Sequence, residues 1–164
     1  MDGESGSVDS LAIEVILHRP KVALLIESSR AYGRGLLRGV AAYARNHGPW
    51  SLYHDERSLA DAAPPWLKEW KGDGILARID SIQLARQLKE CDLPVVDLLC
   101  RYELPDVPAI DTDNLVTIEM CVEHLRQRGF SQFAFCGFAN VEWSNRRSRF
   151  LKEILARQGM ELSR

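Results

Sequence analysis

The chain has 164 residues, of which 46% are hydrophobic and 27% charged, and it carries a net charge of −2. A chain of this length can bury a substantial core in one domain, whereas its near-neutral charge argues against a protein that grips nucleic-acid phosphates by itself. No apolar run approaches the roughly 20 residues that cross a bilayer, and the acidic start lacks the basic segment of a secretory signal, which favours a cytoplasmic location away from membranes.

Residues 1–20 are expected to form a tail or linker ahead of the folded part. The first ten residues, MDGESGSVDS, are small and acidic. The next ten, LAIEVILHRP, suit either an extra strand or a linker, and their pattern favours neither.

From residue 21 to residue 99, apolar runs of strand length alternate with segments of helical periodicity. In chain order these are the strand KVALLIE (21–27), a helix through residues 36–44 that ends at NHGP, the strand WSLYH (50–54), the short helix PPWLKEW (64–70), the strand GILA (74–77), a helix through residues 82–88, and the strand PVVDLL (94–99). The continuous apolar character of the first run is typical of a strand that is covered on both faces.

The alternation continues to the end of the chain. A short strand is expected in VPAIDTDN (107–114), a helix over Leu115–Arg128, a strand in SQFAFCG (131–137), a helix over Arg146–Gln158, and the possible start of another strand in GMELSR. Asp113 or Asn114 is placed to cap the first of these helices, and Gly129 to end it. Strands and helices that alternate through short connections predict an α/β fold, with a parallel sheet flanked by helices.

Three glycines, Gly33, Gly35 and Gly39, follow the first strand, and Asp55 lies 20 residues beyond Gly35. A dinucleotide-binding turn needs its first glycine directly after the strand, but five residues separate Glu27 from Gly33. The glycines are therefore expected to sit in the first turns of a helix, where they allow close packing against the sheet. Nucleotide binding through Asp55 is kept as a weaker alternative.

The four cysteines are Cys91, Cys100, Cys121 and Cys136. They form no C-x-x-C pair and no tight cluster with histidine, so neither a disulfide framework nor a metal site is predicted. Cys121 shares a helical face with Ile118, Val122 and Leu125, which predicts a buried, small hydrophobic side chain.

Polar and aromatic residues follow three of the predicted strands, at the edge where open α/β sheets bind ligands. They are Ser28, Ser29, Arg30 and Tyr32 after the first strand, Asp111, Asp113 and Asn114 after the fifth, and Asn140, Glu142, Trp143, Asn145, Arg146 and Arg147 after the sixth. Carboxylates and guanidinium groups suit the hydroxyls of a neutral polyol, and a flat ring suits its apolar face. The set contains no nucleophile paired with a base, which favours binding over catalysis.

Each of these residues also has a structural interpretation. Asp113 suits a helix cap whether or not it touches a ligand. Trp143 suits a surface aromatic, and Arg146 or Arg147 suits an ion pair with Glu142 or Glu153.

Several segments resemble LacI/GalR-type effector-binding domains, and most closely those of the xylose operon regulators and their relatives. The resemblance is carried by SRAYGRGLLRGVAAYA (29–44), by the D-x-D-N turn (111–114) with the following EHLRQRGFSQFAFCG (123–137), and by WSNRRSRF (143–150). It implies a periplasmic-binding-protein-like fold in which a sugar such as xylose binds between two lobes and alters the affinity for DNA. It also implies that DNA is bound by an AraC-type helix-turn-helix module that this chain does not contain, and that the regulator needs no cofactor; a homodimer is expected.

Carried over residue by residue, the resemblance assigns ligand contacts to Asp113 and to Arg147. Arg146 is the alternative arginine, because Phe150 stands where the family commonly has glycine. Ser29 and Tyr32 match the first ligand loop, and Trp143 is the aromatic residue that we expect to cover the sugar.

Residues 21–159 are accordingly expected to form an incomplete amino-terminal lobe, and residues 160–164 to begin the crossover to a second lobe. The chain is then the sugar-sensing lobe of a transcription regulator and not an enzyme. A transport-type sugar-binding protein shares the implied fold but would need an export signal. A nucleotide-dependent α/β enzyme is the remaining alternative.

Overall fold

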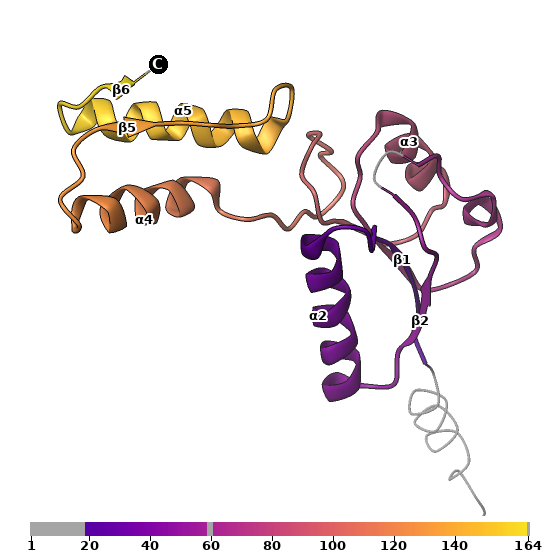
Figure 1. Cartoon of the computed structure of the whole chain (residues 1–164). Coiled ribbons are helices and arrows are strands. Elements are labelled where there is room, and N and C mark those ends of the chain that lie inside the picture. Colours follow the sequence, from indigo (N-terminus) through magenta and orange to yellow (C-terminus); the bar gives the residue numbers. More distant parts are fainter. Residues whose placement is uncertain (1–18, 59–60, 164) are drawn as a thin grey trace, which may run out of the picture. The chain divides into compact units, whose positions relative to one another are not determined.

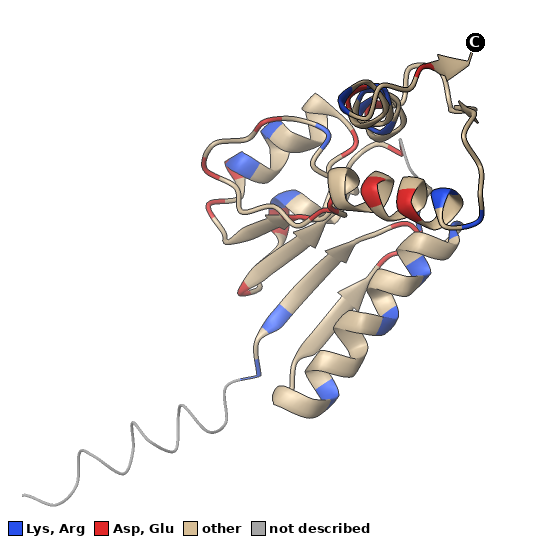
Figure 2. Ribbon diagram, turned by 90° about the vertical axis from the view of Figure 1, so that its left-hand side faces the viewer, with Lys and Arg blue, Asp and Glu red and all other residues tan. Residues whose placement is uncertain are grey.

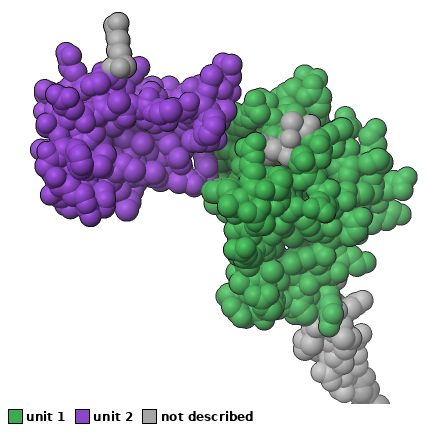
Figure 3. All heavy atoms as spheres, in the orientation of Figure 1, with its two compact units in different colours: residues 1–110 green, residues 111–164 purple. Residues whose placement is uncertain are grey.

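The computed structural model describes residues 19–58 and 61–163, which form two compact units (Figure 3). Unit 1 extends to Ile110, and unit 2 begins at Asp111. Each unit has its own parallel sheet and its own hydrophobic core. Residues 1–18, which belong to the predicted tail or linker and include most of the segment that also suits a strand, lie outside the described part of the chain.

Unit 1 is built around a four-stranded sheet with the strand order β2-β1-β3-β4 (Figure 1). The strands are β1 (Lys21–Leu25), β2 (Ser51–His54), β3 (Gly74–Ala77) and β4 (Val95–Asp97). All three neighbouring pairs are parallel, as the sequence predicts. In the central pair Leu25 lies opposite Ala77, so β1 and β3 end at the same edge of the sheet.

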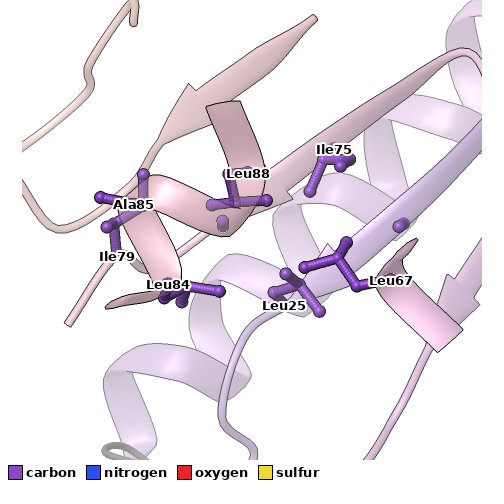
Figure 4. Close-up of a cluster of buried hydrophobic side chains, with 9 residues drawn as sticks. Leu25, Leu67, Ile75, Ile79, Leu84, Ala85 and Leu88 are labelled. Atoms are coloured by element: carbon purple, nitrogen blue, oxygen red, sulfur yellow. The ribbon is translucent and has the colours of Figure 1, made fainter. Parts of the chain in front are cut away.

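The side chains of β1 alternate between two cores, one on each face of the sheet. Val22, Leu24 and Ile26 pack on the side of α2 (Ala31–His47). Ala23 and Leu25 belong to the other core, which includes residues of the 3-10 helix η1 (Pro65–Glu69) and of α3 (Ile82–Glu90) (Figure 4). Burial on both faces explains why the first strand reads as an unbroken apolar run.

The predicted fifth strand is reduced to a single bridge between Asp97 and Ala109. The Asp97 amide donates to the Pro108 carbonyl at 2.9 Å, and the Ile110 amide donates to the Asp97 carbonyl at 2.8 Å. Proline has no N–H to extend the ladder, and the residues after Ile110 belong to unit 2. Pairing therefore stops after one residue.

Unit 2 contains two helices and a two-stranded parallel sheet. Its elements are α4 (Asn114–Arg126), β5 (Phe133–Ala134), α5 (Glu142–Arg157) and β6 (Leu162–Ser163). Its core contains residues from α4, β5 and α5, namely Ile118, Val122, Phe133, Leu151, Ile154 and Leu155. Helix α5 starts four residues earlier than predicted, and β6 lies in the segment where a further strand was considered.

The prediction that Cys121 is buried is wrong. Cys121 is exposed, and Leu125 is 38% exposed. Of the four residues on that predicted face, only Ile118 and Val122, which are one turn apart on α4, belong to the core of unit 2. The face that packs is thus a narrow stripe, and Cys121 lies beside it.

Within residues 21–159, which the sequence assigns to an incomplete amino-terminal lobe, the described residues divide after Ile110 into two units with separate sheets. The strand–helix alternation continues unchanged through this point of the sequence, so periodicity gives no sign of the division. In the described part of the chain, no helix combines the length and the apolar character that a membrane crossing requires.

Candidate functional site

The carboxyl ends of β1 and β3 bring Glu27 and Arg78 together in unit 1. Arg78 directly follows β3, and its backbone amide donates to the Leu25 carbonyl at 3.0 Å. Its guanidinium Nη1 donates to Glu27 Oε1 in an ion pair. The side chain of Glu27 is 1% exposed and that of Arg78 10%, so the pair is almost fully removed from water.

Tyr32, in the first turn of α2, completes what we call the Tyr32 cluster: Glu27, Tyr32 and Arg78. The Cζ atom of Arg78 lies 5.1 Å from the centroid of the Tyr32 ring, within the range of a cation–π contact. Tyr32 is nevertheless 48% exposed. Part of its ring surface therefore remains open to a ligand.

Gly33 allows α2 to start directly against the end of β1. A Cβ atom at this position would lie 1.9 Å from the Glu27 carbonyl oxygen and 3.0 Å from Glu27 Cδ. At Gly35 and Gly39 an added Cβ would meet nothing within 4 Å. Of the three glycines, Gly33 has the packing role that the sequence predicts, and it lies within a helix rather than in a phosphate-binding turn.

Ser29, from the predicted first ligand loop, and Asp55, from the nucleotide-binding alternative, both lie in unit 1. Ser29 is exposed on the connection between β1 and α2, where its carbonyl accepts a hydrogen bond of 2.8 Å from Arg34 Nη1. Asp55 accepts a hydrogen bond of 3.2 Å from Trp66 Nε1. The carboxylate that a nucleotide ribose would need is thus engaged by an indole.

In unit 2, Asp113 caps α4 as predicted. Its Oδ1 accepts from the Val116 amide at 3.0 Å, and its carbonyl accepts from Thr117 Oγ1 at 2.6 Å. Asp113 remains exposed, so its carboxylate can accept further hydrogen bonds. Asn114, the first residue of the helix, is buried.

Asn114, Trp143 and Arg147 form a second group, the Trp143 cluster. Arg147 Nε donates to Asn114 Oδ1 at 2.8 Å, and Asn114 Nδ2 donates to the Thr112 carbonyl at 3.1 Å. The Arg147 Cζ atom lies 4.9 Å from the centroid of the Trp143 ring. Trp143 is 38% exposed, and the ring of Phe138 meets it edge-on at 5.7 Å.

The two candidate arginines of α5 have different neighbours. Arg146 Nε donates to Glu142 Oε1 at 3.0 Å, one turn earlier on the same helix. Arg147 reaches Asn114 and Trp143 instead. The contacts of Arg147 therefore link α5 to the start of α4 and to the Trp143 ring.

Glu27, Arg78 and Asn114 were not selected as site residues from the sequence. Glu27 and Arg78 are each the first charged residue after an apolar strand, which is the signal that could have found them. Their pairing depends on which strands are neighbours, and the linear order does not give this. Asn114 was named among the polar residues at the ligand-binding edge of the sheet and as a possible helix cap, but it was not assigned a ligand contact.

Both clusters join an exposed aromatic ring to an arginine that is held by a buried side chain. Glu27 and Arg78 carry opposite charges, so the Tyr32 cluster is balanced; Asp113, which precedes Asn114, supplies a carboxylate at the helix start that Arg147 contacts. In Figure 2 charges of both signs are distributed over the elements: α2 carries three arginines and no carboxylate, and α4 carries two glutamates. Balanced charge beside an aromatic ring suits an uncharged polyol.

A cleft of about 560 Å³ in unit 1 lies elsewhere. It is lined by α3, by the residues around β4 and by residues 104–108, and none of the Tyr32 cluster residues lines it. Within the described residues there is no group of three or more His, Cys, Asp or Glu side chains that could hold a metal ion.

Comparison with protein families gives a match to the XylR N-terminal domain over residues 21–115. A curated relative, the xylose operon regulatory protein of Escherichia coli (strain K12), is 29% identical over 150 residues. The alignment covers 85% of this chain and 37% of the relative. The chain therefore spans little more than a third of the length of that protein.

Two solved structures have similar folds. The structure of the xylose-binding transcription activator xylR matches with a TM-score of 0.71 at 26% identity, covering 90% of this chain and 38% of that one. A periplasmic binding protein/LacI transcriptional regulator from Alkaliphilus metalliredigens, complexed with D-xylulofuranose, matches with a TM-score of 0.71 at 16% identity, covering 88% and 55%. Because the identity to this second structure is only 16%, the match shows a similar fold and nothing more. The chain has the α/β fold of periplasmic-binding-protein-like and LacI-type proteins, and it belongs to the XylR N-terminal domain family.

Proposed function

We propose that this chain is a sugar-sensing part of a bacterial transcription regulator. The observation that carries the proposal is the family match over residues 21–115, together with the 29% identity to a xylose operon regulatory protein. The relatives are regulators rather than enzymes. Xylose or another aldose is the proposed effector, and a helix-turn-helix module outside this chain is the proposed DNA-binding part of a cytoplasmic homodimer.

In this proposal each unit has its own candidate sugar contacts. Ser29 and the open ring surface of Tyr32 act in unit 1. In unit 2 the carboxylate of Asp113 accepts from sugar hydroxyls, the guanidinium of Arg147 donates to sugar oxygens, and the Trp143 ring covers the apolar face of the sugar. The cluster geometry supports Arg147 over Arg146 as the arginine contact.

We further propose that unit 1 is the amino-terminal lobe and that unit 2 belongs to a second one. The separate sheets and cores of the two units support this division. The family match ends at residue 115, five residues beyond the end of unit 1.

Calorimetric titration of the protein with D-xylose, and with a panel of other pentoses and hexoses, tests the proposal. We expect saturable binding of at least one aldose, accompanied by a change in the fluorescence of Trp143 that the Trp143→Phe variant lacks. Arg147→Met should weaken binding by about tenfold, and the matched Arg146→Met variant should leave it nearly unchanged.

The same titration distinguishes the proposed sugar sensor from a nucleotide-dependent enzyme. The sensor proposal fails if no sugar binds while NAD or ATP gives a saturable signal that Asp55→Ala abolishes. Equal losses in the Arg146 and Arg147 variants would contradict the assignment of Arg147.

A further inference from the structure

The Glu27–Arg78 ion pair is not fully satisfied by the protein. Among the described residues, Glu27 Oε2 and Arg78 Nε are buried and have no hydrogen-bond partner. A buried ion pair offsets the cost of desolvation only when its remaining polar atoms are also hydrogen-bonded. Stability by itself is therefore a poor explanation for this pair.

The Glu27–Arg78 pair instead supports the side chain of Tyr32. Glu27 holds the Arg78 guanidinium, and that guanidinium lies against the Tyr32 ring. Gly33 brings the first turn of α2 to within contact of Glu27, and Arg34 Nη1 closes the preceding loop by donating to the Ser28 carbonyl at 2.9 Å. The backbone next to Tyr32 and one side of its ring are thus held by separate contacts.

We propose that Glu27 and Arg78 are positioning residues that hold the Tyr32 ring in the orientation in which it meets the effector. This inference rests on the proposed function, in which Tyr32 contacts a sugar. An unsupported tyrosine on a surface helix samples several rotamers, and fixing it on binding costs conformational entropy. A ring that is held before the sugar arrives avoids part of this cost.

The first test needs no ligand. The protein contains four tyrosines, so the ring signals in a spectrum of protein labelled with ¹³C-tyrosine can be assigned one by one, that of Tyr32 through its loss in Tyr32→Phe. Arg78→Met and Glu27→Gln are expected to shift or broaden the Tyr32 signal and to leave those of Tyr43 and Tyr53 in place. An unchanged Tyr32 signal in both variants would overturn the inference.

The second test is a double-mutant cycle on sugar affinity. Arg78→Met should weaken the binding of the sugar identified by titration by about tenfold, and the same change in a Tyr32→Ala background should have almost no further effect. A residue that acts only through Tyr32 loses its influence when the ring is absent. Equal losses in both backgrounds, or no loss in either, would contradict a positioning role.

Removing one charge of a buried pair can unfold a protein, so the cycle is repeated with Glu27→Gln/Arg78→Met, which leaves no unpaired charge. Its melting temperature separates lost folding from lost positioning. Arg149→Met is the matched control, because Arg149 also lies over an aromatic ring, that of Phe150 at 5.8 Å, but outside both clusters. If the unmodified protein binds no sugar, the proposed function fails, and the ligand-free spectrum still decides whether Arg78 and Glu27 hold Tyr32.

Discussion

Gly33 and Gly35 belong to the same stretch of α2 but meet different surroundings. At Gly33 an added Cβ atom would overlap the backbone oxygen of Glu27, and a backbone atom cannot rotate aside as a side chain can. At Gly35 the space is open. In a helix interior glycine is less favourable than alanine by roughly 1 kcal/mol, so only the first position has a packing reason to keep glycine.

Gly33→Ala is therefore expected to lower the free energy of unfolding by about 3 kcal/mol, because α2 must move away from the end of β1. Gly35→Ala, the matched control, should raise it by about 0.5–1 kcal/mol. Urea unfolding followed by circular dichroism measures both changes. A stabilised Gly33→Ala variant would show that the close approach of α2 to Glu27 is absent in solution.

Cys91 lies half-buried at the end of α3. Its thiol donates to the Gln87 carbonyl at 3.3 Å and to the Leu67 carbonyl at 3.6 Å. Burial, with a smaller contribution from the Glu90 carboxylate, raises the pKa of Cys91 above the usual value for a cysteine. Since the folded-state pKa exceeds the unfolded one, the stability that this thiol contributes is present below the unfolded pKa and is lost as the pH rises through the folded one.

Iodoacetamide reacts with the thiolate, so Cys91 should be alkylated more slowly than the exposed Cys121 and Cys136 at mildly alkaline pH. The alkylation rate of Cys91 should also reach half-maximum at a higher pH than that of a cysteine in a short unstructured peptide. Peptide mass spectrometry after timed quenching measures each site separately. Equal rates at all three cysteines would contradict the raised pKa.

At the scale of the element, the start of α4 combines a helix cap with candidate ligand contacts. Asp113 satisfies the Val116 amide, and Asn114 connects the same turn to Arg147 on α5. A carboxylate that caps a helix at its edge can still accept a hydroxyl, so the structural and the binding interpretations of Asp113 are compatible.

Asp113→Ala should lower the free energy of unfolding by about 1 kcal/mol through loss of the cap, whereas Asp113→Asn should keep the cap and the stability. If the charge contacts sugar, Asp113→Asn should still weaken sugar binding in calorimetry. Ser81→Ala is the control, since Ser81 caps α3 by accepting from the Leu84 amide at 3.2 Å. That change should cost similar stability without altering sugar affinity.

At the scale of the whole molecule, the described residues divide into two units with separate cores. The cores of unit 1 contain residues of β1 and β3, among others, and that of unit 2 contains residues of α4, β5 and α5. No residue of one set belongs to the other. Loss of packing in one core should therefore lower the stability of its own unit first.

Leu155 is fully buried in unit 2, and Leu155→Ala should destabilise that unit by about 3 kcal/mol. In hydrogen-exchange mass spectrometry, peptides from residues 111–163 should exchange faster, while peptides from β1 and β3 keep their protection. Ile75→Ala, in the core of unit 1, should give the opposite pattern. Equal loss of protection in both units would show that they unfold as one.

Much of the fold could be predicted from the sequence because it depends on local periodicity. The unbroken apolar run of β1 predicted a strand buried on both faces, and the polar residue before α4 predicted its cap. The prediction for Cys121 failed because a hydrophobic pattern gives the direction of a helix face but not the width of the stripe that its neighbours cover.

The site was less predictable than the fold. The edge of the sheet, Tyr32 and Trp143 could be proposed from residue types that follow strands. The Tyr32 ring meets Arg78, and Arg147 beside the Trp143 ring donates to Asn114, so both arrangements depend on residues from distant points of the chain. Two adjacent arginines on α5 look alike in sequence, and only the 100° turn between them directs Arg147 and not Arg146 toward Asn114.

Local patterns and matched segments are enough to predict the succession of strands and helices, the parallel character of the sheet and the family of this chain. The three-dimensional arrangement was needed to show that one sheet ends at β4 and another begins with β5, and that Glu27, Arg78 and Tyr32 meet. Strand pairing and side-chain contacts join residues that are far apart in the chain. The alternation of strands and helices continues unchanged past Ile110, so it does not indicate which strands pair with one another.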